Sequence, residues 1–205
     1  MRYARGHKDE ARARILDAAG RGFRKHGSSI GVDGLAKEAG VTSGAFYGHF
    51  HSKAEAFRAV VATGLGRLRA GIETFQAEHH RAWVDAFAAF YLGAPHRHDI
   101  AGGCALPSLS AEVGRADEVV RATYQTELQG VADAIASGLP SDTPEHLRDT
   151  AWVMLALLAG GVVMARGVRD GAVAEEIADA VSDAVSRLAQ HDQQGPEAGT
   201  QEVRQ

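Results

Sequence analysis

The sequence predicts an all-α protein, and three observations lead to this fold class. Apolar residues recur at spacings of three and four along most of the 205 residues, which places them on one side of a helix. No hairpin dipeptide lies between two stretches of alternating polarity, so β-hairpins are not predicted. Hydrophobic residues make up 45% of the chain, enough for a core shared by about nine helices.

Three helices, the second and third of them short, are expected at the N-terminal end. The first runs from about Lys8 to His26 and ends at Gly27, because a left-handed glycine often closes a helix. The second covers residues 32–39. The third covers residues 43–49 and follows Thr42, whose side chain can cap it. We expect these helices to form a domain over residues 1–52.

A long fourth helix, Lys53–Ala77, follows Ser52 as its cap and leads without a loose linker into a second domain over residues 53–190. Thr143 and Pro144 are expected to open a later helix as its cap and first residue. The second domain is expected to hold helices over 80–92, 105–113, 117–139, 144–167 and 172–190, with a loop around Pro95. The polar residues 191–205 predict a disordered tail.

The charges are divided unevenly along the chain. The net charge is −4, which alone would argue against a nucleic-acid partner. Residues 1–60, however, hold 11 Lys and Arg against 6 Asp and Glu, a net charge of +5 that includes all four lysines. Residues 61–205 have a net charge of −9. This division predicts a small basic module on an acidic body.

Several classes of protein are excluded by what the chain contains. Its single cysteine, Cys104, excludes an internal disulfide framework and a multi-cysteine metal site. The charged N-terminus has no apolar signal segment, and the longest apolar run, Ala151–Ala165, is short for a membrane span. A metal at His96, His98, Asp99 and Cys104 is a weaker interpretation than a solvated loop. We therefore expect a cytoplasmic protein with no membrane partner, no metal and no cofactor.

The residues between the second and third helices meet the demands of a helix-turn-helix. Ala36 is small where two helices cross, and Gly40 lies where the turn needs a positive φ. Thr42 caps the third helix, whose first N–H groups can then face a phosphate. Gly44 and Ala45 are small enough for that helix to enter a major groove.

The segment Leu35–Phe57, LAKEAGVTSGAFYGHFHSKAEAF, resembles the signature of the TetR (tetracycline-repressor) family of transcriptional regulators. The matching motifs are Leu-Ala, Ala-Gly-Val-Thr, Tyr-Gly-His-Phe and Lys-Ala-Glu-Ala-Phe. One departure is Gly31 before the second helix, where many members have a capping threonine. The resemblance implies phosphate contacts by Thr42, Tyr47, His49 and Lys53, base contacts near Ser43, Gly44 and Ala45, and backbone or minor-groove contacts by Arg2 and Arg5 in an unstructured arm.

The apolar residues of the last two helices predict a homodimer. A helix that is apolar all round, such as 151–165, needs cover on every side. The resemblance implies that two such helices from each subunit form a four-helix interface. Its expected residues are Leu155, Leu158, Gly161, Val162, Ile177, Val181 and Val185.

The aromatic residues of the middle helices have two interpretations, ordinary core packing and a ligand pocket. As a pocket they would include Trp83, Phe87, Tyr91, Cys104, Leu109, Tyr124 and Trp152. Cys104 also follows two glycines at the start of a short helix, a position that lowers a thiol pKa. It is therefore either inert packing or a thiol sensor.

These observations predict a ligand-responsive transcriptional repressor rather than an enzyme. It would bind a palindromic DNA operator as a dimer and be released by an unidentified small-molecule effector or by modification of Cys104. The alternatives are a hydrolase or transferase that uses Cys104 with His96 or His98, and an architectural DNA-binding protein.

Overall fold

The computed structural model describes residues 3–140 and 143–191. This part of the chain contains ten α-helices, two 3-10 segments and no strand, in agreement with the all-α prediction. The elements are α1 (Tyr3–His26), η1 (Gly27–Ser29), α2 (Val32–Glu38), α3 (Ser43–Tyr47), α4 (Lys53–His79), η2 (His80–Ala82), α5 (Trp83–Leu92), α6 (Ala94–His98), α7 (Ala105–Val113), α8 (Glu118–Gly138), α9 (Pro144–Gly167) and α10 (Gly171–His191).

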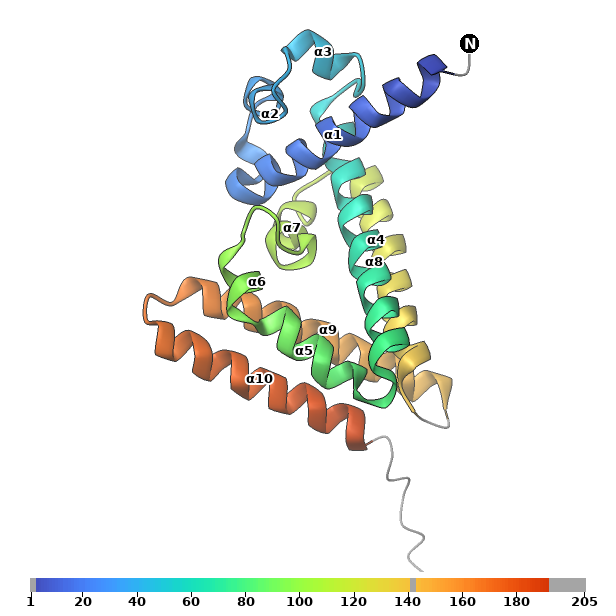
Figure 1. Cartoon of the computed structure of the whole chain (residues 1–205), viewed down its shortest axis with the longest axis vertical. Helices are drawn as coiled ribbons and strands as arrows, with labels where there is room; N and C mark the ends of the chain where they lie inside the picture. Colours follow the sequence, from blue (N-terminus) through green and yellow to red (C-terminus); the bar gives the residue numbers. More distant parts are fainter. Residues whose placement is uncertain (1–2, 141–142, 192–205) are drawn as a thin grey trace, which may run out of the picture.

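The helices form two groups that α4 connects (Figure 1). Helices α1–α3 gather at one end of the molecule, and α4 runs from there with α8 packed along it. Helices α5, α9 and α10 pack together at the other end. Because Phe23 of α1 and Phe57 of α4 meet edge-on with ring centroids 5.0 Å apart, the apolar core continues from one group to the other.

Helices α2 and α3 form a helix-turn-helix. Gly40 has φ +65° in the turn, a conformation that favours glycine. The Val41 N–H donates to the Ala36 carbonyl at 3.0 Å, which closes the turn. Phe46 of α3 and Phe50 after it are fully buried against the domain core, so the opposite side of α3 is left to solvent.

Helix α4 begins with two reciprocal hydrogen bonds. The Ser52 hydroxyl accepts from the Glu55 N–H at 3.0 Å, and the Glu55 carboxylate accepts from the His51 N–H at 2.8 Å. Side chains at the start of a helix that satisfy backbone donors in this way stabilise its first turn. The predicted Ser52 cap is therefore confirmed.

Two segments that were expected to be irregular are helical. Helix α1 begins at Tyr3, so Arg5 lies within it and not in a free arm, while Arg2 lies outside the described residues. Helix α6 replaces the loop expected around Pro95, because proline has a φ already suited to a first helical turn. Arg97 in α6 is buried and donates to the Ala174 carbonyl at 2.6 Å and to the Glu175 carboxylate.

Two further expectations concern the start of α9 and the residues after α10. Thr143 occupies the capping position of α9 as predicted, but its side chain makes no capping hydrogen bond. Of the tail expected over residues 191–205, only His191 is among the described residues, and it is the last residue of α10.

Helix α9 is longer than its apolar run. Its segment His146–Gly167 is long and apolar enough to cross a membrane by length and composition, and 44% of its most apolar window is buried inside the protein. The expectation that this stretch is short for a membrane span rested on the apolar run Ala151–Ala165 alone. A buried core helix passes the same test, so the finding is weak evidence for a membrane span.

Candidate functional site

The exposed side of α3 holds most of the residues expected to read DNA. Thr42, Gly44 and Ala45 are exposed, and Tyr47 is 49% exposed. The Thr42 hydroxyl accepts from the Ala45 N–H at 3.1 Å, so Thr42 caps α3 as expected. The Tyr47 ring packs edge-on against Phe46, with centroids 6.1 Å apart, which steadies the ring beside an open surface.

Three other residues of the expected DNA surface are half-buried, and two of them form hydrogen bonds within the domain. Ser43 donates to the Asp33 carboxylate at 2.5 Å, which ties α3 to α2. The Lys53 ammonium donates to the carbonyls of Ser28 at 2.7 Å and Ile30 at 3.3 Å. These bonds brace the segment before α2, whose own capping residue offers no side chain. The half-buried His49 has a buried Nδ1 that lacks a hydrogen-bond partner among the described residues.

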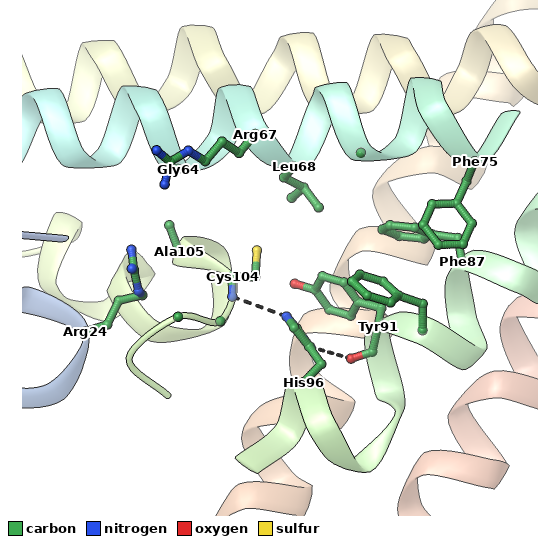
Figure 2. A pocket seen from close by; sticks show the side chains of 14 residues that line it. Arg24, Gly64, Arg67, Leu68, Phe75, Phe87, Tyr91, His96, Cys104 and Ala105 are labelled. Carbon is green, nitrogen blue, oxygen red and sulfur yellow. Dashed lines mark hydrogen bonds between the residues drawn. The ribbon is translucent and has the colours of Figure 1, made fainter. Parts of the chain in front are cut away.

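A cavity of about 200 Å³ has walls from α1, α4, α5 and α7 (Figure 2). Of the residues expected to line a pocket, it includes Phe87, Tyr91 and Cys104. The lining residues of α1 and α4 were not among those expected. The full lining consists of Arg24, Gly64, Arg67, Leu68, Gly71, Phe75, Phe87, Phe90, Tyr91, His96, Gly102, Gly103, Cys104 and Ala105.

Other residues expected in the pocket belong to the core. Trp83 is buried and donates from its indole nitrogen to the Gly138 carbonyl at 2.9 Å. Leu109 is buried as well. Tyr124 shares a hydrogen bond of 2.8 Å with the Ser110 hydroxyl. None of these three residues lines the cavity.

Cys104 faces the cavity, but its thiol is not activated. Its sulfur accepts from the Leu106 N–H at 3.4 Å at the start of α7. Burial raises the thiol pKa, and this effect outweighs the Tyr91 hydroxyl, the Leu106 N–H and the guanidinium groups of Arg166 and Arg24, all of which favour the thiolate. The expected lowering is therefore wrong, because desolvation penalises the thiolate more than its position on the helix stabilises it.

His96 holds the segment before Cys104 in place. Its Nδ1 lies 2.6 Å from the Tyr91 carbonyl, and its Nε2 accepts from the Cys104 N–H at 3.2 Å. A carbonyl can only accept and an amide N–H can only donate, so these partners select the neutral tautomer with its proton on Nδ1. Burial, opposed by the bond to the Tyr91 carbonyl, lowers the pKa of His96.

The described residues also contain no group of three or more His, Cys, Asp or Glu side chains that could hold a metal ion. Both ring nitrogens of His96 have protein partners, which makes that histidine a poor ligand.

Arg24 is the main pocket residue that the sequence analysis missed. It extends from α1 and donates from Nε to the Ala101 carbonyl at 2.6 Å, in the segment that leads to Cys104. A Cβ built on Gly20 would lie 3.1 Å from the Arg24 guanidinium. A glycine four residues before an arginine leaves room for the arginine side chain to lie along the helix. The spacing of Gly20 and Arg24 is therefore the sequence signal that could have placed the Arg24 side chain.

Several residues expected at a dimer interface lie inside the protomer. Leu155, Leu158, Val162 and Val185 are buried. A Cβ built on Gly161 would lie 3.0–3.2 Å from side chains of neighbouring α5 and α10. These positions face the core because α9 and α10 pack on each other and on α5 within one chain. Ile177 and Val181 are half-buried.

A different set of apolar residues faces outward from α9 and α10. Val153, Val163 and Met164 of α9 and Val173 of α10 are exposed. No atom lies within 4 Å of a Cβ built on Gly160, apart from the glycine's own neighbours. The expected pocket residue Trp152 is half-buried on the same helix, with the Arg148 guanidinium 5.9 Å from its ring centroid.

Comparisons with known proteins agree with the N-terminal geometry. The model of the family described as bacterial regulatory proteins, tetR family, matches residues 15–60, from the second half of α1 to the first turns of α4. These residues therefore carry the N-terminal region of the TetR family of transcriptional regulators. The resemblance in Leu35–Phe57 is thereby confirmed.

Two curated relatives are similar to this chain near its N-terminus. The transcriptional regulator SrpR of Pseudomonas putida is 46% identical over 56 residues, which are 27% of this chain and 26% of SrpR. The uncharacterized regulator YfiR of Bacillus subtilis is 33% identical over 79 residues, 38% of each chain. The matches therefore cover less than half the length of either relative.

Solved TetR-family structures show that the fold extends over the whole body. Escherichia coli NemR in its reduced form has a TM-score of 0.70 at 22% identity, covering 85% of this chain and 96% of NemR. A TetR-family regulator from Streptomyces coelicolor has a TM-score of 0.71 at 23% identity, covering 91% and 97%. Since members of the TetR family are transcription factors, the hydrolase or transferase interpretation is set aside.

Proposed function

We propose that this TetR-family protein is a dimeric repressor that binds a palindromic DNA operator and leaves it when a small molecule occupies the pocket. The first domain, residues 1–52, would read DNA. The second, residues 53–190, would dimerise and bind the effector in the cytoplasm. The exposed side of α3 carries this proposal, since Thr42 and Tyr47 are available there while the opposite side is buried.

The DNA-binding part of the proposal assigns two kinds of contact. Thr42 and Tyr47 contact phosphates, and Gly44 and Ala45 allow the α3 backbone to approach base edges. Lys53 and Ser43 act mainly by holding the domain together, given their bonds to Ile30 and Asp33. Arg5 would reach the DNA backbone from the first turns of α1.

Fluorescence anisotropy with DNA from upstream of the protein's own gene tests this part. We expect saturable binding that weakens as salt is raised. Tyr47→Phe removes only the hydroxyl and should weaken binding several-fold, as loss of one hydrogen bond to a charged group does. Tyr124→Phe, far from α3, is the matched control. Binding that is equal for all DNA sequences would favour the architectural alternative.

The effector part rests on where the cavity lies. Its walls come from α1 of the DNA-binding domain and from α4, which enters both groups of helices. A ligand there can change the placement of the DNA-binding domain, provided that it binds the DNA-released state more tightly. Modification of Cys104 is the weaker route to release, because the raised pKa keeps its thiol protonated. A Cys104→Ser protein that no longer leaves DNA on ligand binding would reverse this order.

A further inference from the structure

The cavity has an apolar part and a polar end (Figure 2). Leu68, Phe75 and Phe87 line the apolar part. At the polar end the Tyr91 hydroxyl points toward Cys104, and the Arg24 guanidinium lies beyond it. A ligand that fits this arrangement has an apolar body and one polar group.

The polar end has donors that the protein leaves unused. Tyr91 is 2% exposed, and its hydroxyl oxygen has no hydrogen-bond partner among the described residues. It faces Cys104 without forming a hydrogen bond of normal geometry to the sulfur. Arg24 uses Nε to bind the Ala101 carbonyl, and its two terminal nitrogens have no hydrogen-bond acceptor in the described part of the chain. Leaving a buried polar group such as the Tyr91 hydroxyl unsatisfied costs free energy, so a ligand that accepts from it would gain affinity. The half-buried Arg24 guanidinium adds a positive charge beside it.

The charges around the polar end favour an anion. Arg24 and Arg67 both line the cavity, and the described lining includes no Asp or Glu. Arg67 is paired with Asp17 at 2.5 Å. Among the described residues, Arg24 forms no ion pair and its hydrogen bond goes to a neutral carbonyl, although Asp99 is near enough to raise its pKa. Burial lowers the pKa of Arg24, and the neighbouring Arg67 lowers it further. An anion would offset both effects.

We propose that the effector is a small apolar carboxylate, with its carboxylate bound by Arg24 and the Tyr91 hydroxyl and its apolar part against Leu68, Phe75 and Phe87. An apolar cavity of about 150 Å³ holds benzene. The cavity of about 200 Å³ therefore admits one ring with a short acidic arm. This inference rests on the proposed role of the pocket as the effector site.

Arg24 also gives the ligand a direct connection to the DNA-binding domain. It belongs to α1, whereas Ala101, Tyr91 and Cys104 belong to the body. A carboxylate held between Arg24 and Tyr91 sets the position of α1 relative to α5. The ligand then favours one placement of the DNA-binding domain. By linkage, bound ligand lowers the affinity for DNA by the same factor by which bound DNA lowers the affinity for the ligand.

The test measures binding of three probes of nearly equal shape by isothermal titration calorimetry on the full-length protein without DNA. The probes are phenylacetate, phenylacetamide and 2-phenylethylamine. We expect phenylacetate to bind with a Kd below about 1 mM and at least about tenfold more tightly than the amide, because its hydrogen bonds are charge-assisted. The amine should not bind. Absence of phenylacetate binding, or equal affinity for the amide, would overturn the proposal.

Variants at the polar end separate the anion site from general apolar binding. Arg24→Gln should abolish the preference for the carboxylate, and Tyr91→Phe should weaken phenylacetate several-fold. Arg14→Gln removes an exposed charge from the same helix, outside the lining, and should change neither. Circular dichroism checks that each variant is folded. If Arg24→Gln does not fold, Tyr91→Phe decides, and full affinity in that variant would overturn the proposal.

DNA affinity is measured separately, so the two proposals can fail independently. Saturating phenylacetate should lower the DNA affinity of the unaltered protein and leave that of Arg24→Gln unchanged. A carboxylate that binds through Arg24 without affecting DNA would overturn the coupling. A protein that binds phenylacetate but no DNA would refute only the proposed function.

Discussion

The reactivity of Cys104 depends on the side chains packed around it. Its helix position and two nearby guanidinium groups favour the thiolate, yet burial raises the pKa of the thiol from an ordinary value of 9.0. We therefore expect slow alkylation by iodoacetamide at pH 7.5, with a rate that rises roughly tenfold per pH unit until the pH exceeds 9. Mass spectrometry reports the adduct unambiguously, because the chain has one cysteine. The urea-unfolded protein is the control, and equal rates in both states at pH 7.5 would contradict the expectation.

Thr42 links the stability of α3 to DNA recognition. Its hydroxyl caps the helix through the Ala45 N–H, and replacing such a cap with alanine costs about 1 kcal/mol. Thr42→Ala should lower the free energy of unfolding by that amount in urea titrations and also weaken DNA binding. Thr42→Ser keeps the hydroxyl and should stay near the original stability. Equal losses in both variants would show that the methyl group, not the cap, is what stabilises the helix.

At the scale of one element, two glycines of α4 have opposite roles although they are two residues apart. A Cβ on Gly64 would lie well inside van der Waals contact with Ala105 at the start of α7, whereas a Cβ on Gly66 meets nothing within 4 Å. Gly64→Ala should destabilise the protein by about 1–3 kcal/mol through overpacking. Gly66→Ala should stabilise it by about 0.5–1 kcal/mol, because alanine favours a helix. Thermal unfolding of both variants checks the contrast, which fails if the two shifts have the same sign.

For the assembly of the molecule, we expect the outward residues of α9 and α10 to determine the oligomeric state. Met164 is 55% exposed beside the exposed Val163, and we propose this patch as the dimer face in place of the interface residues expected from the sequence. Met164→Asp would place a charge there and should shift the protein to monomers in light scattering after size exclusion. Val119→Asp alters a valine of equal exposure, 55%, at the start of α8, and should leave the dimer intact. A dimeric Met164→Asp protein would exclude this face.

Much of the architecture could be predicted because it depends on local sequence. The glycine in the turn, the caps at Thr42 and Ser52 and the apolar spacing act within a few residues. The predicted bounds of α7 match those of the structure. The exceptions were Arg5, which lies within α1, and the segment around Pro95, where Arg97 is buried and binds the Ala174 carbonyl of α10.

Tertiary packing decided the functional details of the body. Leu155 and Met164 are both apolar residues of α9, and only the packing of α10 and α5 shows that the first faces the core and the second faces solvent. The pocket likewise joins Arg24 to Cys104 across 80 residues of chain. The sequence by itself determined the all-α class, the basic helix-turn-helix and its family, since these depend on short-range spacing. The structure alone decided which side chains share the cavity and how acidic its thiol is, because burial and charge depend on residues distant in the chain.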